Sequence, residues 1–127
     1  INLNDIPILI VVLLVVASMV FLTEINSNAA STAIFLPVLA GLSKAGGLHP
    51  YLLMIPATIA ASCAFMLPSG TGPNASVLAS GYLSIPQMAK AGLGLNLLVI
   101  IVIVATMYFI TLPSLDITSE LPFWALY

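Results

Sequence analysis

Two short clusters of polar residues interrupt a chain that is otherwise strongly apolar, and their side chains have the chemistry of ion ligands. The first cluster, Thr23–Asn28, lies between two apolar runs, and the second, Ser69–Asn74, lies between two more. Hydrocarbon offers no hydrogen-bond partners, so helix-breaking polar segments at membrane depth occur only where protein lines a cavity. Transporters place substrates and ions at broken helices of this kind. The two clusters therefore predict a binding site inside a membrane.

The composition independently indicates a membrane setting. Of the 127 residues, 61% are hydrophobic and only 5% are charged, whereas about a quarter of the residues of a soluble domain are charged. We expect an integral, multi-pass protein of the plasma or inner membrane, in contact with the lipid bilayer. Two basic residues in a chain of net charge −2 exclude a nucleic-acid partner. The single Cys63 excludes an internal disulfide and is interpreted as a small packing residue.

The start of the chain is polar, with Asn2, Asn4 and Asp5 ahead of Pro7, which suits a first helical turn. It carries neither an initiator Met nor the charged segment and cleavage site of a signal peptide. We therefore expect a fragment or domain of a longer membrane protein, so that a site found here is part of a larger one.

The first polar cluster predicts the tip of a re-entrant helical hairpin. The flanking runs, Ile8–Leu22 and Ala29–Leu42, are each shorter than the roughly 20 residues that cross a bilayer, and Pro37 should kink the second. The alternative is one kinked helix over Ile8–Leu42, about 50 Å long. Such a helix is too long for the bilayer and places Glu24 near its middle, so we favour the hairpin.

The second cluster predicts a broken transmembrane helix. The apolar run Tyr51–Leu67 ends at Pro68, and a shorter run, Ala75–Tyr82, follows the glycine-rich break. Beyond it, the spacing of Ser84 and Gln87 is that of a capping box, which could start a short helix at the membrane interface.

Only the run Leu93–Leu112 has the length of an ordinary transmembrane span. Trp124 and Tyr127, in the polar tail, suit an interfacial aromatic belt. The chain thus divides into a re-entrant hairpin with its tip and following loop (1–50), a broken transmembrane helix with an interfacial connection (51–92), and a last transmembrane helix with a polar tail (93–127). The predicted fold class is an all-α integral membrane protein.

Both clusters offer oxygen ligands and helix termini. A helix starting near Ala29 would direct N–H donors and its positive dipole end at Ser27 and Asn28, which suits a carboxylate or another oxyanion. Carbonyl groups at the end of the preceding helix, near Leu22–Glu24, suit a small cation. Gly70–Asn74 repeats this arrangement, since its glycines allow a ligand to approach the backbone closely.

Several polar residues have two interpretations. Glu24 is either an intramembrane functional carboxylate or a group with a structural partner. Asn96 is interpreted as a contact between helices rather than a ligand, and His49 as a surface residue. The glycosylation sequon at Asn74 should stay unmodified at membrane depth. Only Glu24 is available as an acid or nucleophile, so we do not expect an enzyme.

The segment Thr23–Thr32, followed by Phe35–Val38, resembles the second signature of the divalent anion/sodium symporter family. Ile55–Thr58 and Ala64–Ala75 resemble the broken-helix segment of the same family. Two motifs in the right order carry this resemblance, which covers about Ile8–Leu112. It implies sodium-coupled transport of di- or tricarboxylates or sulfate by an elevator mechanism.

The resemblance also implies a set of site residues. In the family, one Ser-Asn-Thr motif per inverted repeat holds the substrate, and here the second motif is Ser27-Asn28-Ala29, one hydroxyl short. The substrate site would comprise Ser27, Asn28, Ala29 and Thr71, which leaves the preferred anion open. The sodium site would comprise Thr23, Asn28, Gly70 and Asn74.

Partners implied by the resemblance are a small dianion, Na⁺ and the N-terminal half of the same transporter, which would form a homodimer through upstream scaffold helices. Two alternatives stay open. A sodium-independent anion exchanger of the same family could use similar loops. A non-transporting helical subunit could use its polar clusters only to bond neighbouring helices.

Overall fold

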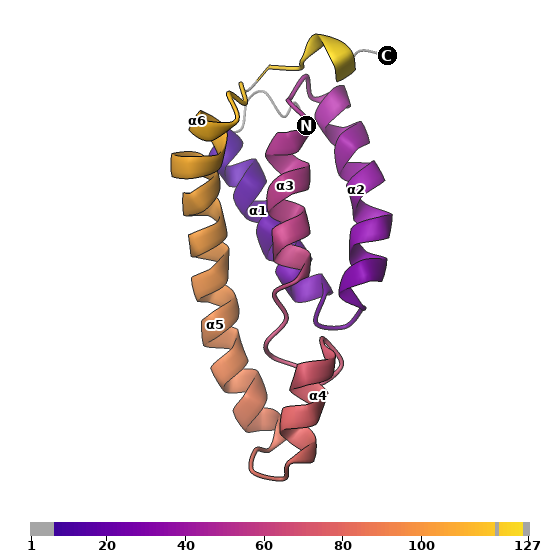
Figure 1. The fold of residues 1–127 in the computed structure, drawn as a ribbon, viewed down its shortest axis with the longest axis vertical. Helices are drawn as coiled ribbons and strands as arrows, with labels where there is room; N and C mark the ends of the chain where they lie inside the picture. The colour runs from indigo at the N-terminus through magenta and orange to yellow at the C-terminus, as the bar shows by residue number, and fades with distance from the viewer. Residues whose placement is uncertain (1–6, 119, 126–127) are drawn as a thin grey trace.

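A computed structural model of the chain describes residues 7–118 and 120–125 (Figure 1). The predicted polar start at Asn2, Asn4 and Asp5 lies outside these residues, as does Tyr127. The described part is helical apart from its connections, as the sequence predicts. Its helices are α1 (Ile8–Leu22), α2 (Asn28–Ala45), α3 (Tyr51–Ala61), α4 (Gly72–Ala79), α5 (Ile85–Thr106) and α6 (Leu112–Ser114), with a π-helical segment, Met107–Thr111, between the last two and a 3₁₀ turn, Phe123–Ala125, in the tail.

The first two helices form a hairpin whose turn is the first polar cluster (Figure 1). Helix α1 has the predicted bounds, whereas α2 starts at Asn28 and continues through Pro37 to Ala45. Ser27 is the N-cap of α2, and its Oγ accepts a hydrogen bond from the N–H of Ala30 at 3.2 Å. A serine at this position satisfies one of the free N–H groups at a helix start, which explains why the chain re-enters a helix there.

The third apolar run does not stay helical to its end. Helix α3 stops at Ala61, although the apolar run continues to Leu67, and α4 starts only at Gly72. Residues 62–71 therefore form an unwound segment, which we call the loop. Pro68 disfavours a helical conformation at the residue before it. The backbone N–H groups of Phe65, Met66 and Leu67 also donate to the Glu24 carboxylate, so they cannot form the hydrogen bonds of a helix.

Helix α5 starts earlier than predicted. The capping box is present, with the N–H of Ser84 donating to Gln87 Oε1 at 2.9 Å, but it starts the long helix itself rather than a separate short one. With the segments that continue it, the helix runs over Ile85–Ser114, 30 residues, and its most apolar 18-residue stretch has a mean hydropathy of 2.6. It is the one helix in the described residues that is long and apolar enough to cross a membrane. At 1.5 Å per residue it is about 45 Å long, which exceeds a hydrocarbon core of about 30 Å.

The core lies where α3 packs against α1, α2 and α5. Figure 1 shows α3 between α1 and α2, with both helix breaks at about the height of the middle of α5 and the break after α3 nearer to it. Ala57, Ala60 and Ala61 are fully buried on α3, and small residues of this kind let membrane helices approach one another closely. The arrangement brings two polar breaks, distant in sequence, to the same depth of the molecule.

The predicted surface position of His49 is wrong. His49 is buried, and its Nδ1 accepts a hydrogen bond from the N–H of Tyr51 at 3.2 Å. Its ring lies edge-on to Trp124, with ring centroids 5.6 Å apart. An antiparallel bridge between Leu48 and Glu120 brings the C-terminal tail to this end of the hairpin. Burial lowers the pKa of His49, because the charged form loses its hydration.

Candidate functional site: oxygen ligands between two helix breaks

Three oxygen atoms meet at the hairpin turn. The Thr23 hydroxyl, fully buried, lies 2.6 Å from Asn28 Oδ1 and 2.8 Å from the carbonyl oxygen of Ala61. A hydroxyl has a single proton and can donate to only one of these two acceptors at a time. The group therefore holds more oxygen lone pairs than donors, which is the chemistry of a site for a hard cation.

The predicted sodium ligands Thr23 and Asn28 are thus neighbours in space. The Ala61 carbonyl is a member of the group that the sequence reasoning did not identify. Ala61 is the last residue of α3, and the final carbonyl groups of a helix have no partner within it. Knowing that α3 ends at Ala61 would have identified this carbonyl group. The sequence did not show that end, because the apolar run continues to Leu67.

The loop approaches the hairpin turn most closely at Gly70. A Cβ atom at Gly70 would lie 2.8 Å from the Cβ of Ala64 and 3.0 Å from Oε2 of Glu24. Only a glycine allows the backbone to pass this close to both groups. Gly70, predicted as a sodium ligand, therefore lies against Glu24.

Asn74 spans the loop from the first turn of α4. Its Nδ2 donates to the carbonyl oxygens of Ala64, at 2.8 Å, and Leu67, at 3.0 Å. The amide nitrogen therefore stabilises the loop, and Oδ1 is the atom of this side chain that could reach a cation. Thr71 is the N-cap of α4, and its Oγ1 lies 3.5 Å from the N–H of Asn74.

The predicted substrate residues are not all brought together. Ser27 and Ala29 are exposed at the start of α2, and Thr71 is half-buried at the start of α4. Among the residues that the structure describes, no hydrogen bond joins Ser27 or Asn28 to Thr71 or Asn74. The two helix starts remain the predicted anion-binding elements, because each presents N–H groups at its first turn.

Glu24 connects the two breaks. The residue is 3% exposed, and its carboxylate accepts four hydrogen bonds from neutral N–H groups. The donors are the backbone N–H groups of Phe65, Met66 and Leu67, at 2.8, 3.0 and 2.9 Å, and the side-chain Nδ2 of Asn96, at 2.7 Å. The Glu24 carbonyl oxygen also accepts a bond from Ser69 Oγ at 3.0 Å. Glu24 thus has the structural partners that one of its two interpretations requires. Asn96, predicted to contact another helix, bonds instead to a side chain of the hairpin turn.

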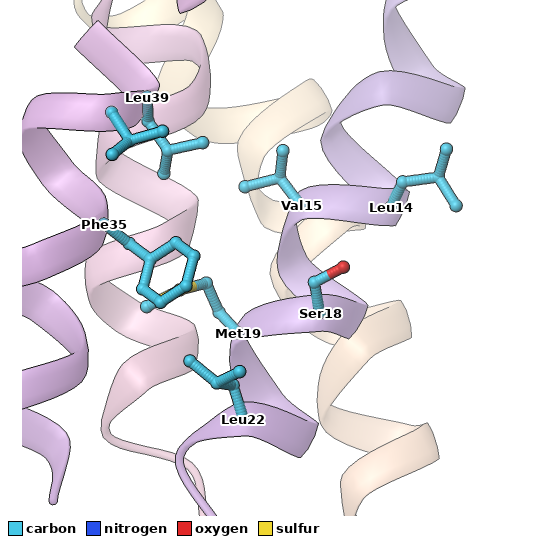
Figure 2. Close-up of a pocket in the computed structure, with 8 residues that line it drawn as sticks. Leu14, Val15, Ser18, Met19, Leu22, Phe35 and Leu39 are labelled. Atoms are coloured by element: carbon cyan, nitrogen blue, oxygen red, sulfur yellow. The ribbon is translucent and has the colours of Figure 1, made fainter. Parts of the chain in front are cut away.

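A groove of the hairpin is apolar and unlike an anion site. It has a volume of about 260 Å³ and lies between α1 and α2, where Phe35, Leu39 and Met19 point toward one another (Figure 2). Ser18 is the single polar residue among those that line it. A dianion in this groove would lose its hydration without gaining donors, so the groove is not the substrate site. Among the described residues no group of three or more His, Cys, Asp or Glu side chains could hold a metal ion.

The paired polar breaks, and the one described helix that is long and apolar enough to cross a membrane, are features of helical membrane proteins. Residues 2–115 match the family described as "Sodium:sulfate symporter transmembrane region". The chain belongs to this family, which confirms the resemblance carried by Thr23–Thr32 and Ala64–Ala75. The family is one of transporters and not of enzymes.

The curated relatives carry a more specific name. The chain is 51% identical over 116 residues to "Sodium-dependent dicarboxylate transporter SdcS" of Staphylococcus saprophyticus, an alignment that covers 90% of this chain and 22% of that protein. It is 49% identical over 102 residues to the protein of the same name from Staphylococcus aureus strain MRSA252, covering 79% of this chain and 20% of that protein. The chain thus spans about a fifth of the length of these relatives.

Proposed function

We propose that this chain is part of a sodium-coupled carrier that moves small dianions, dicarboxylates first among them, across a plasma or inner membrane. One observation carries the proposal most directly. The oxygens of Thr23, Asn28 and Ala61 converge in a buried position between two helix breaks, and the relatives are named for sodium-dependent dicarboxylate transport.

The order of binding follows from the chemistry of the two breaks. Sodium binds first among the oxygens of Thr23 and Asn28, with Gly70 and Asn74 contributing from the other break. The ion fixes the hairpin turn, so that Ser27, Asn28 and Thr71 can hold the carboxylates of the substrate. Without the cation, an anion held only by neutral dipoles at membrane depth is poorly stabilised. This requirement couples anion transport to sodium.

The hairpin is re-entrant in this proposal. Helices α1 and α2 are 15 and 18 residues long, or about 22 and 27 Å, which is less than a hydrocarbon core of about 30 Å. The hairpin turn then lies inside the membrane beside the loop. The two breaks move together with α5 as one unit of an elevator, against a dimeric scaffold formed by the remainder of the carrier.

The test is uptake of radiolabelled succinate, citrate and sulfate by the full-length parent carrier in proteoliposomes, with sodium replaced by choline in the control. Sodium-dependent uptake of succinate is expected. Asn28→Ala should abolish both uptake and its activation by sodium, because this amide serves both ligands. Equal wild-type uptake in sodium and choline would instead identify an exchanger, and the absence of uptake from folded protein would favour a structural subunit.

A further inference from the structure

An elongated groove lies between α2 and α3, which pack side by side (Figure 1). It consists of two adjoining cavities of about 390 and 330 Å³, both of which are lined by Tyr51 and Met54. On α2 the lining residues Leu36, Ala40 and Lys44 are four positions apart, so they lie on one face of the helix. From Leu36 to Lys44 the helix rises about 12 Å. We call this space the α2–α3 groove.

One end of the α2–α3 groove carries a cation. Lys44, in the last turn of α2, lines this end and is exposed. Within residues 7–118 and 120–125, no acidic side chain lies within ion-pair distance of Lys44. Tyr51 and Trp124 line the same end, with ring centroids 5.4 Å apart. Membrane proteins place lysine, tyrosine and tryptophan at the level of the lipid headgroups. This end therefore suits the membrane surface and a negatively charged group.

The other end of the groove is apolar. Leu36, Ile55 and Ile59 line it. Thr58 lies there as well, but its hydroxyl already donates to the carbonyl oxygen of Met54, at 2.7 Å. A charged or polar molecule in this part would lose its hydration without gaining new partners. The occupant of this end must therefore be apolar.

We propose that the α2–α3 groove binds an anionic phospholipid, with its phosphate at Lys44 and an acyl chain between the two helices. Both ends are needed to select such a molecule. A free phosphate ion would leave the apolar end empty, and a lipid without net charge would leave Lys44 without a net anionic partner. The groove opens at the end of the hairpin opposite its turn (Figure 1), so the lipid site goes beyond the proposed function and uses none of its residues.

A groove covered by another part of the carrier makes a different prediction. In that case, the lipid headgroup has no effect, and a side chain added in the groove lowers the stability of the carrier whether or not lipid is present. Gly41 offers the position for this comparison. It lines the groove beside Lys44, and a Cβ there has no neighbour within 4 Å. A larger residue at this position therefore enters the groove without a clash inside the described part of the chain.

The experiment measures the thermal stability of the purified full-length carrier in detergent, titrated with phosphatidylglycerol, phosphatidylcholine or inorganic phosphate. A ligand that binds only the folded protein raises its melting temperature, and the dependence on ligand concentration gives an apparent Kd. We expect phosphatidylglycerol to bind about fivefold more tightly than phosphatidylcholine, which is the contribution of one lysine near an anionic lipid. Inorganic phosphate should have no effect at the same concentrations.

The variants separate the two ends of the site. Lys44→Gln should weaken the binding of phosphatidylglycerol by about fivefold and leave that of phosphatidylcholine unchanged. Lys90→Gln is the matched control, because Lys90 is the second of the two basic residues of the chain and is exposed near the start of α5. It should change both affinities by less than about twofold. Gly41→Leu should weaken both lipids by about tenfold, since its side chain displaces about two CH₂ groups of the acyl chain.

Equal affinity of the wild type for the two lipids would overturn the inference, as would equal effects of Lys44→Gln and Lys90→Gln. Stabilisation by inorganic phosphate that matches that by phosphatidylglycerol would show a site for a free anion instead. If Lys44→Gln does not fold, Gly41→Leu decides, and unchanged lipid binding in that variant overturns the inference. None of these measurements involves sodium or succinate, so their outcome is independent of the proposed function.

Discussion

The two helix breaks differ in how many of their polar groups are hydrogen-bonded within the protein. The hairpin turn between α1 and α2 is short, and Ile25, Asn26 and Ser27 are exposed there. The loop between α3 and α4 is longer and is bonded internally and to the hairpin. Glu24 accepts from three of its N–H groups, and Asn74 donates to two of its carbonyl groups. Unwound backbone at membrane depth needs such partners. The loop is thus held in place by hydrogen bonds with Glu24 and Asn74, whereas the hairpin turn keeps polar groups available for a ligand.

Removing the Glu24 carboxylate, which accepts most of the hydrogen bonds to the loop, should have the largest effect on the stability of the carrier. Glu24→Leu leaves three backbone N–H groups and the Asn96 amide without their acceptor, and each unsatisfied buried group costs about 1–3 kcal/mol. We expect a loss of more than about 3 kcal/mol in stability, seen as a strong decrease in the yield and thermal stability of detergent-solubilised carrier. Ile25→Ala, at a position 74% exposed in the hairpin turn, should be nearly neutral. Equal stability of the two variants would show that the loop does not depend on Glu24.

Adding a side-chain atom where α5 contacts the loop backbone should cause the next largest loss of stability. A Cβ at Gly92 would lie 2.2 Å from the Phe65 carbonyl oxygen and 2.6 Å from the Cα of Met66, both backbone atoms. Gly92→Ala should therefore destabilise the carrier by about 1–3 kcal/mol, measured by thermal unfolding in detergent. Gly94→Ala is the matched control, because a Cβ there has no neighbour within 4 Å. It should be neutral or stabilise by up to about 1 kcal/mol. Two equal responses would contradict the close contact at Gly92.

Removing the Asn74 side chain, which also bonds to the loop, should lower the stability by less. Asn74→Ala loses the two hydrogen bonds to Ala64 and Leu67, and we expect a loss of about 1–2 kcal/mol. Hydrogen exchange of the full-length carrier should show faster exchange across residues 62–71 and unchanged exchange in the hairpin turn. Ser76→Ala is a suitable control, since Ser76 lies on the same helix, is exposed, and bonds only to the carbonyl of Gly72. Faster exchange confined to the hairpin turn would reverse the roles that we assign to the two breaks.

The smallest effect is expected at His49, far from both breaks. Its pKa is lowered in the folded state, so its contribution to stability is present above the unfolded pKa of about 6.5. The contribution is lost as the pH falls through the lower folded value. Acidification should therefore speed the exchange of the Tyr51 amide, after correction for the intrinsic rate, because protonated Nδ1 no longer accepts its bond. His49→Gln should remove this pH dependence, and a dependence that persists in that variant would exclude His49 as its cause.

The sequence predicts helices well where apolar runs end at polar residues, as α1 shows with its bounds at Ile8 and Leu22. It fails where a long-range contact decides the end of a helix. Little in the local sequence marks Ala61 as the end of α3, because apart from Ser62 the residues up to Leu67 are apolar. The N–H groups of Phe65, Met66 and Leu67 bond to Glu24, about forty positions earlier in the chain. The same limit applies to His49, whose burial depends on Trp124 at the other end of the chain.

In the candidate site, too, the features set by the local sequence could be predicted and those set by long-range contacts could not. The pairing of Thr23 with Asn28 could be predicted, since both lie in one short turn and match one motif. The Ala61 carbonyl and the role of Asn96 could not, because both depend on how α3 and α5 pack against that turn. The substrate set of Ser27, Asn28, Ala29 and Thr71 stays a prediction.

The most direct test of the account is binding of radioactive ²²Na⁺ to the purified full-length carrier, compared between wild type and Thr23→Val. Valine keeps the shape of threonine and removes the hydroxyl that lies between Asn28 and Ala61. The account predicts folded protein that has lost a component of sodium binding, while Ser69→Ala in the loop binds sodium as the wild type does. Sodium binding by Thr23→Val equal to that of the wild type would contradict the placement of the ion at the hairpin turn.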